Sequence, residues 1–296
     1  MNLLEFHTIS KCFGERIVLK DASASVSSGI TGLLGANGSG KTTLLRVIAG
    51  LLDQDSGEVF FNREKISQKS KFWRSRIGYL PQSPALYERM TVTEYLDYML
   101  LLSGWKQHRK RQDRIEELIH SLNLVPYKDA ALGHLSGGTK QRAAIGQAFI
   151  HNPSVLLLDE PTNNLDAEER IRFHNQLVAQ SQQRIVLYVG HVVNDLALVC
   201  SKILVLAEAQ IRFEGEPQEL VRLMKGVVKE AAFQSSDSLD VARLGLSILR
   251  VGRNAEHLTI RYDARFEDSP DGTEVVPTLE EAYQAFCNSV RLENKQ

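Results

Sequence analysis

The glycine-rich stretch GANGSGKT at residues 35–42 limits the possible folds of this chain more than any other feature of the sequence. It has the full spacing of a phosphate-binding loop, in which backbone N–H groups surround the phosphates. The apolar run ITGLL at 30–34 precedes it and a helically spaced segment, 42–52, follows it, which is the strand–loop–helix setting that the motif requires. We therefore predict an α/β core in which Lys41 reaches the β and γ phosphates and Thr42 places its hydroxyl on Mg²⁺.

A second turn of the same chemical kind lies further along the chain. HLSGGTKQRAAIGQAF at 134–149 begins with a Ser-Gly-Gly turn and continues with helical apolar spacing, which predicts a helix at 137–150. A helix N-terminus after such a turn binds anions through its free N–H groups and the positive end of its dipole. Because the chain already has a complete phosphate loop, the turn has no obvious ligand within the same chain.

Two carboxylates follow an apolar run in VLLLDE at 155–160. A buried strand that ends there would bring Asp159 near the Mg²⁺ shell and Glu160 to a position from which it orients an attacking water. These are the two tasks that remain once the phosphates are held, so the sequence predicts hydrolysis of the nucleotide as well as binding.

The order of the patterns predicts a sheet with two additions. Alternating residues indicate strands at 3–9, 16–26 and 58–62, which we expect in an antiparallel β subdomain. Helical spacing then predicts a helical subdomain at about 85–150, with helices at 91–105, 109–122 and 137–150. Continuous apolar runs at 155–158 and 185–189, with a helix at 167–180 between them, are typical of fully buried parallel strands. We expect further strands at 77–80, before the helical subdomain, and at 203–206 and 211–213, which close the sheet.

The composition changes after residue 220. The patterns there indicate strands at 226–233, 247–252 and 257–264, loops at 234–238 and 267–272, and a terminal helix at 277–286. We therefore predict a main domain at 1–220 and a small α+β domain at 221–296, whose role, in regulation or in dimer contact, the sequence leaves open.

Composition excludes some partners without naming one. A net charge of −1 gives no reason to expect a nucleic-acid surface. The start, MNLLEFHTIS, has no basic and apolar leader pattern, and no apolar run is long enough for a membrane span, so we expect a cytoplasmic protein. Cys12, Cys200 and Cys287 are far apart in sequence, which favours free buried thiols over a zinc site.

Six motifs in one order resemble the ATP-binding subunits of ABC transporters over residues 1–220. Besides GANGSGKT and LLLDE, they are LPQ at 80–82, LSGGTKQR at 135–142, NNLD at 163–166 and GHVVND at 190–195. Two positions depart from the family pattern. Gly190 replaces the usual Ser or Thr before the histidine, and Ala209 stands where a glycine is usual, but neither change removes a catalytic group.

The resemblance implies a site for ATP and Mg²⁺. Glu160 would be the base, Gln82 would sense Mg²⁺ and the attacking water, and His191 would contact the γ-phosphate. Phe13 would stack on adenine, with Phe6 as the other candidate and core packing of Phe13 as the alternative. The ion would be bound by Thr42, Gln82 and Asp159, and the nucleotide by residues of the glycine loop, namely Gly35, Asn37, Gly38, Ser39, Gly40, Lys41, Thr42 and Thr43.

The family also supplies a ligand for the second turn. Two subunits, either two copies of this chain or this chain and a homologue, would pack head to tail, so that each ATP lies between the glycine loop of one and the Ser-Gly-Gly turn of the other. Ser136, Gly137 and Gly138 would then contact the γ-phosphate of the partner's nucleotide, and Asp166 would lie at the same seam.

The stretch at 78–104 resembles the exporter subclass, whose permease is a separate membrane-spanning chain. Residues 82–105 would receive a short helix of that permease and hold the subunit at the inner face of the cell membrane. The alternative is a translation or ribosome-linked ATPase, which NNLD and the basic run at 106–114 favour. That branch carries two ATPase halves in one chain, and this chain has one set of motifs, so we expect the run to be a solvated helix face and expect no nucleic acid.

Overall fold

The chain contains two units in the computed structural model, Met1–Glu214 and Gly215–Gln296. The structure describes residues 2–190, 192–234, 247–253, 257–266 and 271–293. The predicted loop residues 235–238 and 267–270 lie outside the described part, as does His191.

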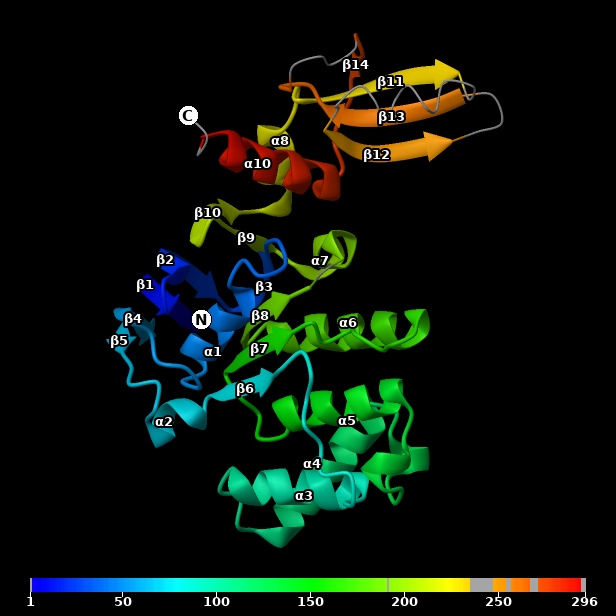
Figure 1. Cartoon of the computed structure of the whole chain (residues 1–296). Helices are drawn as coiled ribbons and strands as arrows, with labels where there is room; N and C mark the ends of the chain where they lie inside the picture. Colours follow the sequence, from blue (N-terminus) through cyan, green and yellow to red (C-terminus); the bar gives the residue numbers. More distant parts are fainter. Residues whose placement is uncertain (1, 191, 235–246, 254–256, 267–270, 294–296) are drawn as a thin grey trace. The chain divides into compact units, whose positions relative to one another are not determined.

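A six-stranded sheet forms the centre of the first unit, with the order β10-β9-β3-β8-β7-β6 (Figure 1). Neighbouring strands from β9 to β6 pair in parallel, and β7 and β8 are buried along their whole length. The buried parallel strands predicted at 155–158 and 185–189 are therefore confirmed, whereas the strand predicted at 211–213 forms part of the half-buried β10. The bounds are β3 (Gly29–Leu34), β6 (Ile77–Leu80), β7 (Val155–Asp159), β8 (Ile185–Val189), β9 (Lys202–Ala207) and β10 (Gln210–Gly215).

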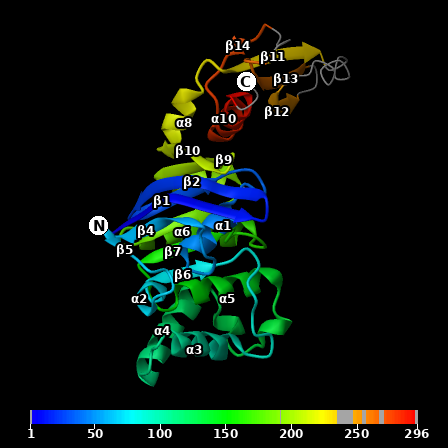
Figure 2. The same ribbon diagram turned by 60° about the vertical axis from the view of Figure 1, so that its left-hand side comes forward.

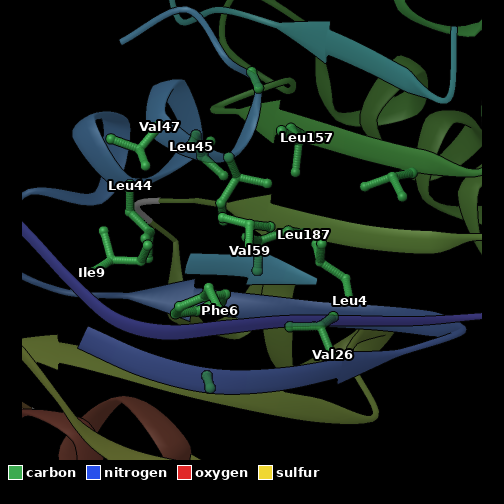
Figure 3. Close-up of a cluster of buried hydrophobic side chains, with 14 of the residues drawn as sticks. Leu4, Phe6, Ile9, Val26, Leu44, Leu45, Val47, Val59, Leu157 and Leu187 are labelled. Carbon is green, nitrogen blue, oxygen red and sulfur yellow. The ribbon is translucent and has the colours of Figure 1, made fainter. Parts of the chain in front are cut away.

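A second, antiparallel sheet has the order β2-β1-β4-β5, with β1 (Leu3–Phe13), β2 (Arg16–Ser27), β4 (Ser56–Phe61) and β5 (Glu64–Lys65). Helix α1 (Lys41–Ile48) packs between this sheet and the parallel one. Figure 3 shows the shared core, in which Phe6 of β1 and Leu45 of α1 lie with Leu157 of β7. α1 ends at Ile48 and not at 52, because Gly50 has a left-handed φ of 71° that interrupts the helix.

Three helices gather beside β6 in both views, and they confirm the helical part of the predicted fold (Figures 1 and 2). They are α3 (Val92–Leu102), α4 (His108–Ser121) and α5 (Gly137–Phe149), with 3-10 turns at Val125–Tyr127 and Leu132–His134. α3 begins at a capping box, in which Thr91 accepts from the N–H of Glu94 and the Glu94 carboxylate accepts from the N–H of Thr91.

The basic run at 106–114 is exposed at Lys106, His108, Arg109 and Lys110, as expected, but two of its arginines have partners inside the protein. Arg111 is buried and pairs with Asp97 at 2.6 Å, and Arg114 donates to the carbonyls of Phe149 and Ile150. These guanidinium groups fix α4 to α3 and α5, because their donors have partners inside the protein.

Further helices pack on the unit. α6 (Ala167–Ser181) and α7 (Val193–Val199) contact β3, and α2 (Lys71–Arg74) contacts β6. The patterns missed α2 and α7 because segments this short contain at most two turns.

Of the three thiols, Cys200 is buried beside β3, Cys287 is half-buried and Cys12 is exposed. The expectation of a buried Cys12 is wrong, because the end of β1 lies at the surface.

The described residues of the second unit form a four-stranded sheet of order β12-β13-β11-β14 and the helices α8 and α10. Arg261 of β13 joins the sheet to α10, since it pairs with Glu230 of β11 at 2.7 Å and with the buried Glu281 of α10 at 3.1 Å. The terminal helix is longer than predicted. The bounds are α8 (Pro217–Leu223), β11 (Val228–Gln234), β12 (Ile248–Arg253), β13 (His257–Asp263), β14 (Thr273–Glu274) and α10 (Leu279–Glu293).

Candidate functional site

The glycine loop connects β3 to α1 and borders a cavity of about 490 Å³. Gly40 has a φ of 107°, and a Cβ there would lie 2.7 Å from the carbonyl oxygen of Val18, so only glycine fits. Lys41 Nζ donates to the carbonyls of Gly35 and Ala36 at 2.7 and 2.9 Å. Burial lowers the pKa of this ammonium, while the charges of Glu160 and Asp159 oppose that effect.

Most of the predicted nucleotide-binding residues meet at this cavity. Its lining consists of Phe13, Arg16, Val18, Asn37, Gly38, Gly40, Lys41, Thr42, Thr43, Gln82 and Glu160. Gly35, Ser39 and Asp159 belong to the loop or to the floor beneath it and are not among the lining residues. Arg16 is a lining residue that sequence reasoning missed, and its Nη2 donates to the Gly38 carbonyl at 3.3 Å.

Phe13 lies at the mouth of the cavity and is 51% exposed, whereas Phe6 is fully buried in the core. The ammonium of Lys11 lies 5.7 Å from the centroid of the Phe13 ring. The exposed ring is free to stack on a base, and core packing of Phe13 is excluded.

A hydroxyl and a carboxylate meet where β7 ends. Thr42 Oγ1 donates to Asp159 Oδ2 at 2.7 Å, and Asp159 Oδ1 is buried with no hydrogen-bond partner in the described part of the chain. Burial raises the pKa of Asp159, against the hydrogen bond from Thr42. An unpartnered carboxylate oxygen beside a hydroxyl suits a hard cation such as Mg²⁺. No group of three His, Cys, Asp or Glu among the described residues forms a metal site, so the ion would take further ligands from phosphates and water.

Glu160 lies next to Asp159 in a left-handed conformation, with a φ of 53°. Its N–H donates to the carbonyl of Val189 on β8 at 2.8 Å, and its carboxylate oxygen Oε2 accepts from Gln82 Nε2 at 2.9 Å and from Asn163 Nδ2 at 2.7 Å. The structure therefore brings Gln82 and Glu160 together at the end of β6 and β7. Asn163 was not among the predicted site residues, although it lies in the NNLD motif.

The signature turn, residues 136–138, stands apart from this cavity. Ser136 is the exposed N-cap of α5, and its Oγ accepts from the N–H of Thr139 at 3.3 Å. A Cβ on Gly138 would lie 2.9 Å from the carbonyl oxygen of Asn164. Asp166 caps α6 by accepting from the N–H of Glu169 at 2.8 Å. Among the described residues, neither the signature turn nor Asp166 lines the cavity.

The chain is similar to known proteins of one family. A family model described as ABC transporter matches residues 19–163. The uncharacterized ABC transporter ATP-binding protein YxlF of Bacillus subtilis (strain 168) is 36% identical over 219 residues, which cover 74% of this chain and 72% of that protein. The maltose/maltodextrin import ATP-binding protein MalK of Photorhabdus laumondii is 33% identical over 223 residues, covering 74% of this chain but only 60% of that protein.

Solved structures give the same likeness. A nucleotide-free ATP-binding cassette from an ABC transporter superposes with a TM-score of 0.64 and 28% identity, over 73% of this chain and 92% of that one.

Proposed function

The chain belongs to the ATP-binding proteins of ABC transporters, and from this premise we propose that it binds MgATP at the glycine loop and hydrolyses it to drive a separate membrane-spanning permease. One observation carries the proposal. The Thr42–Asp159 pair and the Gln82–Glu160 pair meet beside Lys41 around one cavity, so groups for ion binding, phosphate binding and water activation lie together.

Each residue then has a chemical task. Lys41 would exchange the loop carbonyls for phosphate oxygens, and Thr42, Asp159 and Gln82 would hold Mg²⁺, whose charge offsets that of the phosphates. Glu160 would accept a proton from the water whose oxygen bonds to the γ-phosphorus, while the bond from that phosphorus to the leaving ADP oxygen breaks. We retain His191 as a proposed contact of the γ-phosphate.

Replacement of Glu160 tests the assignment of the base. Glu160→Gln keeps the shape of the side chain but removes the proton acceptor, so we expect intact MgATP binding and turnover reduced by about 1,000-fold or more. The control is Glu168→Gln, because Glu168 is an exposed glutamate of α6 that lies outside the cavity. Near-normal hydrolysis by Glu160→Gln would refute the assignment.

We also propose that two copies of the chain pack head to tail, with the signature turn of each on the ATP of the other. The exposed Ser136 at the N-terminus of the thirteen-residue α5, away from the cavity of its own chain, supports this arrangement. Mixing two inactive variants tests it. Lys41→Ala and Ser136→Ala chains should each turn over slowly alone, but their mixture contains dimers with one fully intact site. Recovery of activity on mixing is expected, and its absence would exclude the head-to-tail pairing.

A groove of about 910 Å³ supports a permease contact. It is lined from α2, β6, α3, α5 and the segment that follows α1, and it includes Pro81 next to Gln82 and the exposed Leu51 and Leu102. A short permease helix in this groove would lie beside the loop that carries Gln82 and would hold the subunit at the inner face of the cell membrane. No helix in the described part of the chain has the length and apolar character of a membrane span. Leu51→Asp with Leu102→Asp should prevent co-purification of the permease and leave ATP binding unchanged.

The transport direction that we propose is export, on the resemblance of residues 78–104 to the exporter subclass. MalK is named for import, so uptake is the competing outcome. The permease that co-purifies should be reconstituted with this subunit facing outward, and its cargo measured inside and outside the vesicles. Under ATP added outside, cargo moved inward corresponds to export from the cell, and cargo moved outward would refute export.

The alternative role in translation has weaker support, which is the NNLD motif at 163–166. The internal partners of Arg111 and Arg114 leave only Lys106, Arg109 and Lys110 as exposed lysine or arginine side chains of the basic run for contact with RNA phosphates. Gel shift with ribosomal RNA at physiological salt should show no complex.

A further inference from the structure

The hydroxyl of Ser136 lies at the end of a row of three hydrogen-bonding side chains on one face of α5. Thr139 Oγ1 lies 2.9 Å from Ser136 Oγ, and Arg142 Nη2 donates to Thr139 Oγ1 at 3.0 Å. Thr139 is only 3% exposed and Arg142 8%, whereas Ser136 is exposed. The row therefore runs from a buried charge to the surface of the signature turn.

Donor and acceptor chemistry fixes one end of this row. A guanidinium group has N–H donors and no acceptor, so Thr139 Oγ1 must accept from Arg142. The proton of the Thr139 hydroxyl is then available to Ser136 Oγ, which also accepts from the Thr139 N–H at 3.3 Å. When the Thr139 hydroxyl donates to it, Ser136 Oγ accepts twice, and its own O–H is left to donate away from the helix.

Several contacts hold the guanidinium group of Arg142 in place behind Thr139. Its Nη1 donates to the carbonyls of Asn123 and Leu122 at 2.6 and 3.3 Å, and its Nε lies 3.0 Å from Glu169 Oε1 on α6. The ring centroid of Tyr127 is 5.7 Å from the guanidinium carbon. Because these contacts fix the position of the guanidinium group, one N–H stays directed at Thr139.

We propose that Thr139 and Arg142 are positioning residues, which orient the Ser136 hydroxyl as a donor to the γ-phosphate of the ATP bound by a second copy of this chain. A hydroxyl that accepts from a charged chain of hydrogen bonds is a stronger donor than an isolated one, and it need not reorient when the anion arrives. This inference rests on the proposed head-to-tail dimer. Neither residue touches the nucleotide.

The test measures dimerisation of the full chain with MgATP by analytical ultracentrifugation, in the Glu160→Gln background so that hydrolysis does not interfere. Thr139→Val keeps the shape but removes the hydroxyl, and we expect it to weaken ATP-dependent dimerisation by about 5- to 10-fold, the value of one hydrogen bond between neutral groups. Thr139→Ser, which restores the hydroxyl, should dimerise within twofold of the parent. ATP binding by the monomer should not change in either variant.

A double-mutant cycle separates positioning from packing. If Thr139 acts through Ser136, Thr139→Val should weaken dimerisation by less than twofold in a chain that already carries Ser136→Ala. An equal loss in both backgrounds, or parent-like dimerisation of Thr139→Val, would overturn the inference. If the valine variant does not fold, Thr139→Ala enters the same cycle.

The two proposals fail in different ways. If Ser136→Ala alone leaves dimerisation unchanged, the proposed contact of the signature turn is wrong. If Ser136→Ala weakens dimerisation and Thr139→Val does not, only the positioning role is wrong.

Discussion

The glycine loop and the signature turn have the same chemistry and differ in how much of a site each provides. The loop folds around a cavity whose wall holds Lys41, and its neighbour Asp159 has a buried oxygen that accepts no hydrogen bond from the described residues. The signature turn has an exposed hydroxyl, and the side chain of Arg142 behind it is held by internal contacts. The loop can surround a ligand by itself, whereas the turn offers one surface to a ligand held elsewhere.

The glycine loop contains Lys41, and Lys140 follows the signature turn. Replacing each lysine in a separate variant should give the largest difference in MgATP binding. Lys41 lines the cavity, while Lys140 Nζ donates to the Gly133 carbonyl at 3.2 Å. Lys41→Ala should weaken MgATP binding to the monomer by about 100-fold, because a charged partner of the phosphates is lost. Lys140→Ala should bind within twofold of wild type in the same calorimetric titration. Equal losses in the two variants would remove the distinction between the turns.

Gly138 of the signature turn lies so close to Asn164 that a larger residue should disturb this turn and spare the glycine loop. A Cβ at this position would lie 2.9 Å from the Asn164 carbonyl oxygen, a backbone atom, so Gly138→Ala must displace the loop after Glu160 or the start of α5. We expect turnover to fall by about 10-fold or more while monomer binding of ATP is retained. Gly137→Ala should keep the parent melting temperature, because its Cβ would have ordinary contacts with Asn164 at 3.7 Å. Weaker ATP binding by Gly138→Ala would contradict the separation.

The hydrogen bond from Asn163 orients the carboxylate of Glu160 at the cavity. Asn163→Ala removes a 2.7 Å hydrogen bond to Glu160, so the carboxylate should be less well oriented. We expect kcat to fall by about 10-fold with an unchanged KM for ATP, since a hydrogen bond to a charged group is lost. Asn175, exposed on α6, provides the matched control, and Asn175→Ala should retain the parent kcat. A raised KM at constant kcat would indicate a binding role for Asn163 instead.

The smallest effect concerns stability without ligand. Because burial raises the pKa of Asp159 above 3.8, its charged form destabilises the folded chain, and Asp159→Asn should raise the free energy of unfolding by about 1 kcal/mol at neutral pH. The difference should shrink as pH falls through the raised pKa, because Asp159 is then neutral in the wild type too. Asp166→Asn keeps a good N-cap and should leave stability unchanged. Urea unfolding at several pH values measures both, and a difference that grows on acidification would contradict the argument.

Sequence patterns predicted the parts of the molecule that depend on local order. The glycine loop and the VLLLDE strand end are each one short stretch of sequence, so local spacing predicted the phosphate loop and the two carboxylates at the strand end. The contact of Gln82 with Glu160 could be expected only from the family, because it depends on the pairing of β6 with β7. Burial decided between Phe6 and Phe13.

The sequence patterns did not predict which side chains contact one another. Residues 136, 139 and 142 share a helix face at the spacing of three, but the direction of their hydrogen bonds depends on how Asn123 and Glu169 hold Arg142. The exposed Cys12 and the buried Arg111 were missed for the same reason, since both depend on which neighbours pack against a surface position.

The ten residues from Glu160 to Glu169 connect the two turns within one chain. Glu160 borders the cavity, the Pro161 carbonyl accepts from Gln141 of α5, Asn164 lies against Gly138, and Glu169 pairs with Arg142. In the proposed dimer, a shift of this short segment on loss of one γ-phosphate would reach the turn that serves the other ATP. Turnover should then show positive cooperativity in ATP.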